Sequence, residues 1–222
     1  MSAVIGLCDL TGNGLRPWIE AGHDAYLVDP QHGFDNESPS GFGGTIYRLA
    51  KTVLEALPEL ARIEDIAFVT GYPPCDDMTV AGARWFADKW MADSVYLAKA
   101  VAVAEQCRTF ALASRAPFFI ENPVGMLAHA FGKPNHTFNP FDYTLLAPED
   151  NYSKRTCLWT GNGFVMPKVQ RDKTLGKPDN RIHMAAPGPD RANFRSITPM
   201  GFARAVFASN ATMRLPTMKG AA

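Results

Sequence analysis

Short apolar runs, separated by glycine, proline and polar residues, recur along the chain and predict the strands of a buried sheet. Runs of roughly four to eight apolar residues bounded by turn signals are typical of strands that are buried on both faces. The predicted strands are 3–8, 24–28, 45–49, 66–69, 117–120 and 154–159, and 138–145 is a further strand-like stretch. Because chemistry in α/β proteins gathers where such strands end, the residues that follow each run are the candidates for function.

Helical spacing of apolar residues predicts the elements between the strands. The predicted helices are 15–21, 52–60, 80–90, 94–113 and 196–210, the last with Thr198 as its cap and Pro199 in its first turn. The apolar face of 94–113 indicates core packing rather than a cofactor site. Residues 31–46 and 161–192 are rich in glycine and proline and predict long loops, and residues 212–222 are expected to be a frayed tail.

The first elements are arranged as in a nucleotide-binding half. Strand 3–8 is followed by Asp9, by the tight turn at residues 11–14, by a helix, and by strand 24–28, which ends at Asp29. Glycine in such a turn allows the backbone to approach a ligand, and an acid about 20 residues further on can accept hydrogen bonds from a ribose diol. Asp29 has that spacing. The alternative is that Asp29 only caps a turn or helix before Pro30.

A cysteine follows the strand 66–69. Gly71 ends this strand, Pro73 and Pro74 stiffen the chain that leaves it, and Cys75 is the first reactive side chain presented. A buried structural cysteine is expected inside an apolar segment, as Cys107 is, whereas a thiol at a strand end can serve catalysis as a thiolate. Two interpretations stay open here: a catalytic Cys75, or a loop cysteine without function.

A carboxylate repeats this arrangement on another strand. Strand 117–120 ends in Glu121, Asn122 and Pro123, so an acid directly follows a buried strand at a proline break. Two parallel strands that end in this way would bring Cys75 and Glu121 to one edge of the sheet. A nucleophile and an acid that converge are more informative than either alone.

Composition sets limits on the class of protein. With 222 residues, 46% of them hydrophobic and 20% charged, one globular domain with a small appendage is expected. No apolar run approaches the ~20 residues needed to span a bilayer, and the N-terminus lacks the basic region of a secretory signal. The four cysteines show no CxxC spacing, which argues against a metal site and favours free thiols in the cytoplasm.

Charge is distributed unevenly although its sum is zero. Residues 1–150 contain 10 Lys and Arg against 19 Asp and Glu, a balance of −9, whereas residues 151–222 contain 12 Lys and Arg against 3 Asp, a balance of +9. A basic final third is expected where one face meets phosphate. The alternative is a solvated basic surface that pairs with the acidic body.

The ordered motifs resemble those of the cytosine-C5 DNA methyltransferases. DLTGNG at 9–14 resembles the family's first S-adenosylmethionine motif, PPC at 73–75 its nucleophile loop, IENPVG at 120–125 its Glu-Asn-Val motif, SKRTCLW at 153–159 its paired-basic strand, and RSITPMGFARAVF at 195–207 its last helix. The amino-acid sequences of the motifs around Cys75, Glu121 and Lys154 are similar to those of short phage and prophage proteins described as cytosine methyltransferases. The resemblance spans residues 3–210.

The resemblance implies a fold and three catalytic roles. The fold would be the α/β, Rossmann-like fold of S-adenosylmethionine-dependent methyltransferases, with a mostly parallel central sheet and helices on both faces. Cys75 would add to C6 of cytosine, because C5 of a neutral pyrimidine is a poor nucleophile until C6 carries an adduct. Glu121 would hold N3 protonated, and Arg155 would bind the base carbonyl. The target base would be flipped out of the DNA stack.

The resemblance also implies binding residues, and it divides the chain. The residues implied for S-adenosylmethionine are Asp9, Leu10, Thr11, Gly12, Gly14, Asp29 and Pro73, and those implied for the substrate are Pro74, Asn122 and Lys154. Residues 1–160 would form the catalytic core, 161–195 a basic loop in place of a target-recognition domain, and 196–222 a helix and tail that complete the core. If the gene belongs to a phage, the protein would act in the cytoplasm of a bacterial host.

Departures from the family pattern leave the substrate open. The family follows PPC with Gln-x-Phe-Ser, where this chain has Asp76-Asp77-Met78-Thr79, and its adenine-binding aspartate has no clear counterpart near Lys51 and Thr52. The large target-recognition domain is also missing. Target recognition is therefore minimal or supplied by a protein partner, or the substrate is smaller than duplex DNA. The alternatives to DNA methylation are the same chemistry on a free deoxycytidine nucleotide, a catalytically silent DNA-binding accessory protein, and, more weakly, a Cys-His hydrolase.

Overall fold

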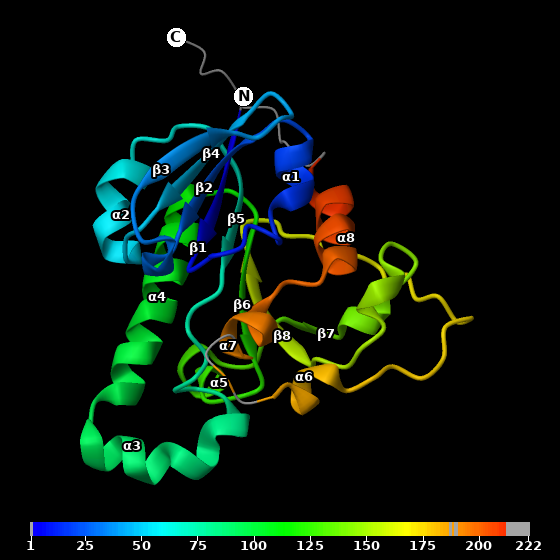
Figure 1. The fold of residues 1–222 in the computed structure, drawn as a ribbon. Helices are drawn as coiled ribbons and strands as arrows, with labels where there is room; N and C mark the ends of the chain where they lie inside the picture. Colours follow the sequence, from blue (N-terminus) through cyan, green and yellow to red (C-terminus); the bar gives the residue numbers. More distant parts are fainter. Residues whose placement is uncertain (1, 187, 189–190, 212–222) are drawn as a thin grey trace.

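The centre of the computed structural model, which describes residues 2–186, 188 and 191–211, is an eight-stranded sheet (Figure 1). In space the strands follow the order β3-β4-β2-β1-β5-β6-β8-β7. Their bounds are β1 Ala3–Leu7, β2 Asp24–Val28, β3 Asn36–Pro39, β4 Thr45–Leu49, β5 Ile66–Gly71, β6 Phe118–Pro123, β7 His136–Phe138 and β8 Thr156–Gly161.

Five neighbouring strands are parallel. They are β4, β2, β1, β5 and β6, whereas β3 pairs antiparallel with β4, β8 with β6, and β7 with β8. If the five parallel strands are numbered 1 to 5 as they occur in the chain, their order in the sheet is 3-2-1-4-5, which is how the Rossmann strand order begins. The direction in which the chain adds strands reverses between β1 and β5. In such sheets ligands bind beyond the carboxyl ends of the strands at the point of reversal. The prediction of an α/β protein with a mostly parallel sheet is confirmed.

Helices cover both faces of the sheet (Figure 1). On one face α2 (Val53–Leu60), α4 (Tyr96–Ser114) and α5 (Leu127–Phe131) pack against the strands, and on the other α1 (Arg16–Glu20) and α8 (Met200–Asn210). Residues from alternating strand positions enter the two cores, for example Phe118 and Ile120 on the α4 side and Phe119 on the α8 side. Because both faces are buried, the strands are continuous apolar runs, which is why the sequence revealed them.

Most predicted elements are confirmed within a few residues, but two stretches were assigned wrongly. Stretch 138–145 is not a strand: β7 ends at Phe138, and Pro140–Tyr143 forms the 3-10 helix η3. The reason is a capping box, in which the Asn139 and Asp142 side chains each bond the other residue's backbone, with Pro140 at the first helical position. The loop predicted at 31–46 contains the short 3-10 helix η1 (Pro30–His32) and the edge strand β3.

Two predicted helices are interrupted. Stretch 80–90 divides into the 3-10 helix η2 (Val80–Trp85), with Gly82 inside it, and the helix α3 (Phe86–Ala92). Stretch 196–210 becomes helical only at Met200, and Thr198 makes no capping bond. Instead Asp150, which ends the 3-10 helix η4 (Pro148–Asp150), accepts a hydrogen bond from Gly201 N at 2.7 Å, so a buried carboxylate lies at the start of α8.

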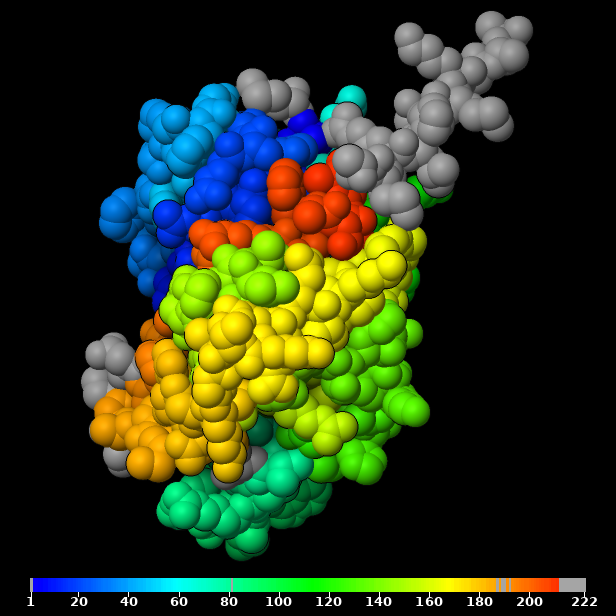
Figure 2. All heavy atoms as spheres, turned by 90° about the vertical axis from the view of Figure 1, so that its right-hand side faces the viewer, coloured from blue at the N-terminus to red at the C-terminus, as the bar shows by residue number. Residues whose placement is uncertain are grey.

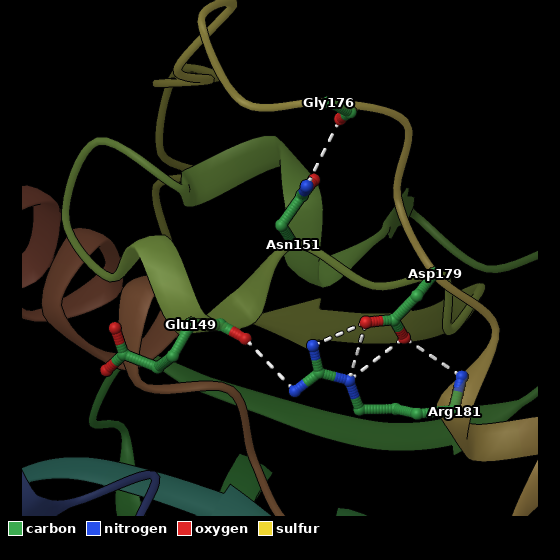
Figure 3. A network of polar contacts seen from close by, with 5 residues as sticks. All are labelled: Glu149, Asn151, Gly176, Asp179 and Arg181. Carbon is green, nitrogen blue, oxygen red and sulfur yellow. Dashed lines mark hydrogen bonds and ion pairs between the residues drawn. The ribbon is translucent and has the colours of Figure 1, made fainter.

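The predicted loop 161–192 contains the helix α6 (Arg181–Met184) and the first residues of α7 (Arg191–Ser196). Figure 2 shows the segment after β8 lying across the flank of the molecule below α8. Figure 3 shows how it is attached: Arg181 pairs with Asp179 and donates to Glu149 O, and Asn151 Nδ2 donates to Gly176 O. These bonds join the segment to the stretch that precedes β8. The tail predicted at 212–222 lies outside the described residues.

No helix in the described part of the chain combines the length and apolar character needed to cross a membrane.

Candidate functional site

The loops after β5 and β6 are joined beyond the carboxyl ends of the parallel strands, at the lower side of the sheet in Figure 1. Met126 N donates to Met78 O at 2.6 Å, and Val80 N donates to Val124 O at 3.2 Å. Gly125 bridges to Thr79 between them. A Cβ at Gly125 would lie only 2.0 Å from Met78 O, so the close approach of the two backbones requires glycine. The PPC and IENPVG motifs are therefore held together by the backbone.

Asn122 fixes the base of the nucleophile loop. Its side chain is fully buried and donates from Nδ2 to Pro73 O at 3.0 Å. Asn122 alternates with Glu121 along β6, so it faces the α4 side of the sheet while Glu121 faces the α8 side. Asn122 was predicted to bind the substrate, and in the structure its amide nitrogen holds Pro73 in place. Pro74, also predicted to bind the substrate, is exposed.

The structure brings Cys75 and Glu121 into one electrostatic site. The pKa of Cys75 is raised to about 11, first by burial and then by the charges of Asp76 and Glu121, and Lys154 and Arg195 oppose the rise. Burial also raises the pKa of Glu121, which Lys154 and a hydrogen bond with Thr156 oppose. The two acids thus favour their protonated forms, and the nearby cations can stabilise the anions when these form.

Of the two basic residues before β8, Lys154 enters this site and Arg155 does not. Lys154 Nζ lies 3.9 Å from Glu121 Oε1, and both side chains are largely buried. Arg155 is exposed, and its charge acts on Cys157, which packs in the core on the α4 side. Successive side chains of an extended chain point to opposite faces, which separates the pair. Of the pair, the structure therefore places Lys154 and not Arg155 beside Glu121.

The turn after β1 is organised by Asp9. Its Oδ1 accepts hydrogen bonds from Gly12 N at 2.8 Å and from Thr11 N at 3.2 Å. Burial raises the pKa of Asp9 to about 6, although these backbone hydrogen bonds oppose the rise. Within the described structure, the second carboxylate oxygen, Oδ2, is buried without a hydrogen-bond partner. Of the other predicted cofactor residues in this turn, Leu10 is half-buried and Thr11 is exposed.

The two glycines of this turn are explained by packing. Gly12 has a φ of +69°, and its missing Cβ would lie 2.9 Å from the Leu27 side chain. A Cβ on Gly14 would lie 1.9 Å from the hydroxyl of Tyr72. The sequence suggested close approach of a ligand at these glycines, but the structure shows close approach of a side chain and, at Gly12, a left-handed backbone.

Asp29, at the end of β2, caps the helix η1. Its Oδ1 accepts a hydrogen bond from Gln31 N at 2.8 Å. The capping bond that was the alternative to a ribose contact is therefore present. A carboxylate can accept through both oxygens, and the bond therefore leaves a ribose contact open. At the place where the resembled family has its adenine-binding aspartate, this chain has Lys51 and Thr52. Lys51 pairs with Asp35 and Glu59, and Thr52 caps α2.

Buried polar groups gather at this edge, and one of them, Tyr72, was not named from the sequence. In the described part of the chain, Asp9 Oδ2 and Asn122 Oδ1 are buried without a hydrogen-bond partner, and the buried hydroxyl of Tyr72 adjoins Thr70 and Thr198, whose hydrogen bonds oppose the rise of its pKa. Tyr72 lies between the two halves of the site, since its pKa is raised first by burial and then by the charges of Asp9 and Glu121. Buried polar groups are almost always paired, so these atoms are candidates for contact with a ligand or with water. The position of Tyr72, directly after a strand, was the available signal.

Two other features do not point to a site. No three His, Cys, Asp or Glu side chains among the described residues are grouped as metal ligands. A groove of about 810 Å³ between α2 and α4, lined by Leu57, Ile63 and Phe110 among others, lies near the start of β5, at the opposite edge from Cys75. Among the described residues that line it there is no cysteine, histidine or lysine.

No protein-family model matches the chain, and no curated protein matches it significantly.

Proposed function

We propose that this protein is an S-adenosylmethionine-dependent methyltransferase that modifies C5 of cytosine in DNA through a covalent adduct at Cys75. The observation that carries the proposal is the convergence of Cys75 and Glu121 at adjacent strand ends, beside the point where the strand order reverses. This supports the resemblance of the PPC and IENPVG motifs to the cytosine-C5 methyltransferases. A thiol and a carboxyl that meet there can contact two positions of one pyrimidine ring.

The raised pKa of Glu121 suits its proposed role, and the cations beside Cys75 oppose the rise in the pKa of the thiol. Cys75 loses its proton as Sγ bonds to C6, and Lys154 and Arg195 stabilise the thiolate that attacks. Glu121, whose raised pKa favours the protonated form, donates to N3 and neutralises the charge that the addition sends into the ring. C5 then has the electron density to accept a methyl group. Methyl transfer would release S-adenosylhomocysteine. Loss of the C5 proton to solvent would then expel Cys75 as a thiolate, N3 would return its proton to Glu121, and the thiolate would take up a proton again.

The residues at the ends of β1 and β2 suit the proposed cofactor. S-adenosylmethionine, when bound, supplies an electrophilic methyl group. The unpartnered Oδ2 of Asp9 can accept from a cationic group such as the ammonium of the cofactor, and Asp29 can accept from its ribose. The carboxylate of Asp9, which burial alone disfavours, would be stabilised by such a cation.

The test is transfer and trapping. With labelled S-adenosylmethionine and cytosine-containing DNA, we expect 5-methylcytosine from the wild type and none from Cys75→Ser. In the presence of S-adenosylmethionine, an oligonucleotide with 5-fluorocytosine should form a stable adduct at Cys75, because after methyl transfer fluorine cannot leave C5 as a proton does. Cys157→Ser is the matched control, since Cys157 is buried on the other face of the sheet. Absence of both transfer and adduct from the wild type would refute the proposal.

A second candidate substrate is a free deoxycytidine nucleotide. It is favoured by the segment between β8 and α8, which in its described residues forms only the short helices α6 and α7 and offers no large surface for reading duplex DNA. The chemistry at Cys75 and Glu121 would be unchanged. Label transferred to the nucleotide but to no form of DNA would decide for it.

A further inference from the structure

Helix α7 lies over the candidate site and connects its two halves. Asn193 Nδ2 donates to Gln31 Oε1 at 3.4 Å, which joins α7 to the loop after β2. The chain that leaves α7 reaches the other half, where Lys154 Nζ donates to Ile197 O at 3.3 Å. The next residue, Thr198, lies beside Gly14, since its Oγ1 is 3.5 Å from the Cβ position of that glycine. Helix α7 thus extends from the Asp29 side to the Glu121 side of the edge.

Two arginines on this helix each have a buried side-chain nitrogen without a hydrogen-bond partner among the described residues. Arg191 and Arg195 are four residues apart, which places them on one face of α7. Within the described residues, the Nε atoms of both are buried without a hydrogen-bond partner, and neither side chain forms an ion pair. Leaving a buried donor unpaired costs free energy, and two like charges on one helix face repel. An anion between them would relieve both costs.

The chemistry around the pair specifies the anion. Arg195 acts electrostatically on Cys75, so its guanidinium is close to the proposed nucleophile, and Lys154 is a third cation at the same place. The carboxyl groups of Asp76 and Glu121 are present too, and Lys154 lies 3.9 Å from that of Glu121. Guanidinium groups match the geometry of phosphate oxygens with paired donors. A base at Cys75 carries its phosphate a few bonds away, within reach of the neighbouring helix.

We propose that Arg191 and Arg195 bind a phosphate group of the nucleotide whose cytosine meets Cys75. The proposal rests on the proposed function and adds a phosphate clamp in the place where the resembled family carries a large recognition domain. The shared chemistry is a nucleotide phosphate, which belongs either to a DNA backbone or to a free deoxycytidine monophosphate. The clamp recognises the backbone and not the base sequence.

The test measures binding of a fluorescent cytosine-containing oligonucleotide as salt is raised. We expect Arg195→Gln and Arg191→Gln each to weaken binding about tenfold and to reduce the slope of log K against log salt by about one, because each loses one phosphate contact. Arg195→Lys keeps the charge and should keep most of the slope. Lys177→Gln is the matched control, since Lys177 is an exposed cation of the same segment, and it should behave like the wild type.

Competition identifies the source of the phosphate. If a free nucleotide is the substrate, deoxycytidine monophosphate should displace the oligonucleotide better than deoxycytidine does, and this advantage should vanish in Arg195→Gln. If DNA is the substrate, the arginine variants weaken oligonucleotide binding while neither small molecule competes. Circular dichroism melting checks that the variants are folded.

Three outcomes separate the clamp from the proposed function. Unchanged salt slopes in both glutamine variants would overturn the clamp, even if 5-fluorocytosine is trapped at Cys75. Loss of S-adenosylmethionine binding with unchanged oligonucleotide binding would also overturn it and assign the arginines to the cofactor. Reduced slopes without trapping in the wild type would support the phosphate site and refute the methyl transfer.

Discussion

Cys75 is kept as a thiol by its surroundings in the free protein. Burial raises its pKa to about 11, and the carboxylates of Asp76 and Glu121 act in the same direction. The two cations beside it, Lys154 and Arg195, partly compensate. A cysteine in this state is protected from oxidation and alkylation, since the thiolate is the reactive form. Its reactivity is therefore set by charges that a substrate can alter, for example by neutralising the effect of Glu121.

This environment predicts a steep pH dependence of alkylation. Below its pKa the thiolate fraction rises about tenfold per pH unit, so the rate at which iodoacetamide modifies Cys75 should keep rising until about pH 11. Lys154→Met removes a cation that favours the thiolate and should slow the reaction at each pH, whereas exposed Lys177→Met should not. Mass spectrometry of the Cys75 peptide gives the rate. A rate that levels off near pH 8.5, as for a free thiol, would contradict the prediction.

At the scale of elements, the site depends on two loops that share a backbone contact. The loop after β5 carries Cys75 and the turn after β6 follows Glu121, and the bridge between Thr79 and Gly125 sets their separation. Asn122 adds a side-chain tie to Pro73. Because these contacts join the two loops directly, the geometry of the site depends on glycine at position 125.

Gly125→Ala tests this dependence. Its new Cβ would lie 2.0 Å from the backbone oxygen of Met78, so the loops must separate, and we expect the free energy of unfolding to fall by about 1–3 kcal/mol. Gly176→Ala is the control: its Cβ would meet nothing within 4 Å, and we expect a change within about 0.5 kcal/mol. Urea denaturation measures both. Equal stability of the two variants would show that the loops tolerate separation.

The sheet could be predicted from sequence because its strands are buried on both faces, whereas other elements depend on partners that are distant in the chain. Helix α7 is short and polar, and it is positioned by contacts with Gln31 and Lys154 that are invisible in its own sequence. Stretch 138–145 is apolar enough for a strand, but the capping bonds of Asn139 and Asp142 turn it into a 3-10 helix. The local sequence pattern therefore predicted the sheet and the helices that cover its faces better than it predicted the segments that cover the strand ends.

The candidate site was predictable in part for the same reason. Parallel strand ends gather at one edge, so the convergence of Cys75 and Glu121 could be expected from two motifs. Either Lys154 or Arg155 could face Glu121, because successive side chains before β8 point to opposite faces of the sheet. A shift of one residue in the register of β8 would exchange the two, and the sequence does not give this register. Tyr72 was missed because its surroundings, Gly14 and Thr198, come from both ends of the chain.

At the scale of the whole molecule, helices cover both faces of the sheet with apolar side chains. Buried polar groups gather instead at the edge formed by the carboxyl ends of the parallel strands. Within the described residues, the unpartnered atoms of Asp9 and Asn122 lie there, with the buried Tyr72 on the strand between them. Each such group costs stability in the free protein. The molecule thus gives up folding free energy at the place where ligand binding would recover it, which is common at functional sites.

This cost predicts how global stability varies with pH. The pKa of Asp9 is 3.8 when unperturbed and about 6 in the folded protein, so between these values the folded state binds more protons than the unfolded state. The contribution of Asp9 to stability is then fully present below about pH 4 and is lost as pH rises through 6, a change of about 3 kcal/mol. The variant Asp9→Asn stays neutral and should lack this fall, whereas exposed Asp88→Asn should keep it. Urea unfolding across this range measures the slopes. Parallel curves for the wild type and Asp9→Asn would mean that the carboxyl is not desolvated, and the edge would then lose its best candidate for holding a cationic ligand.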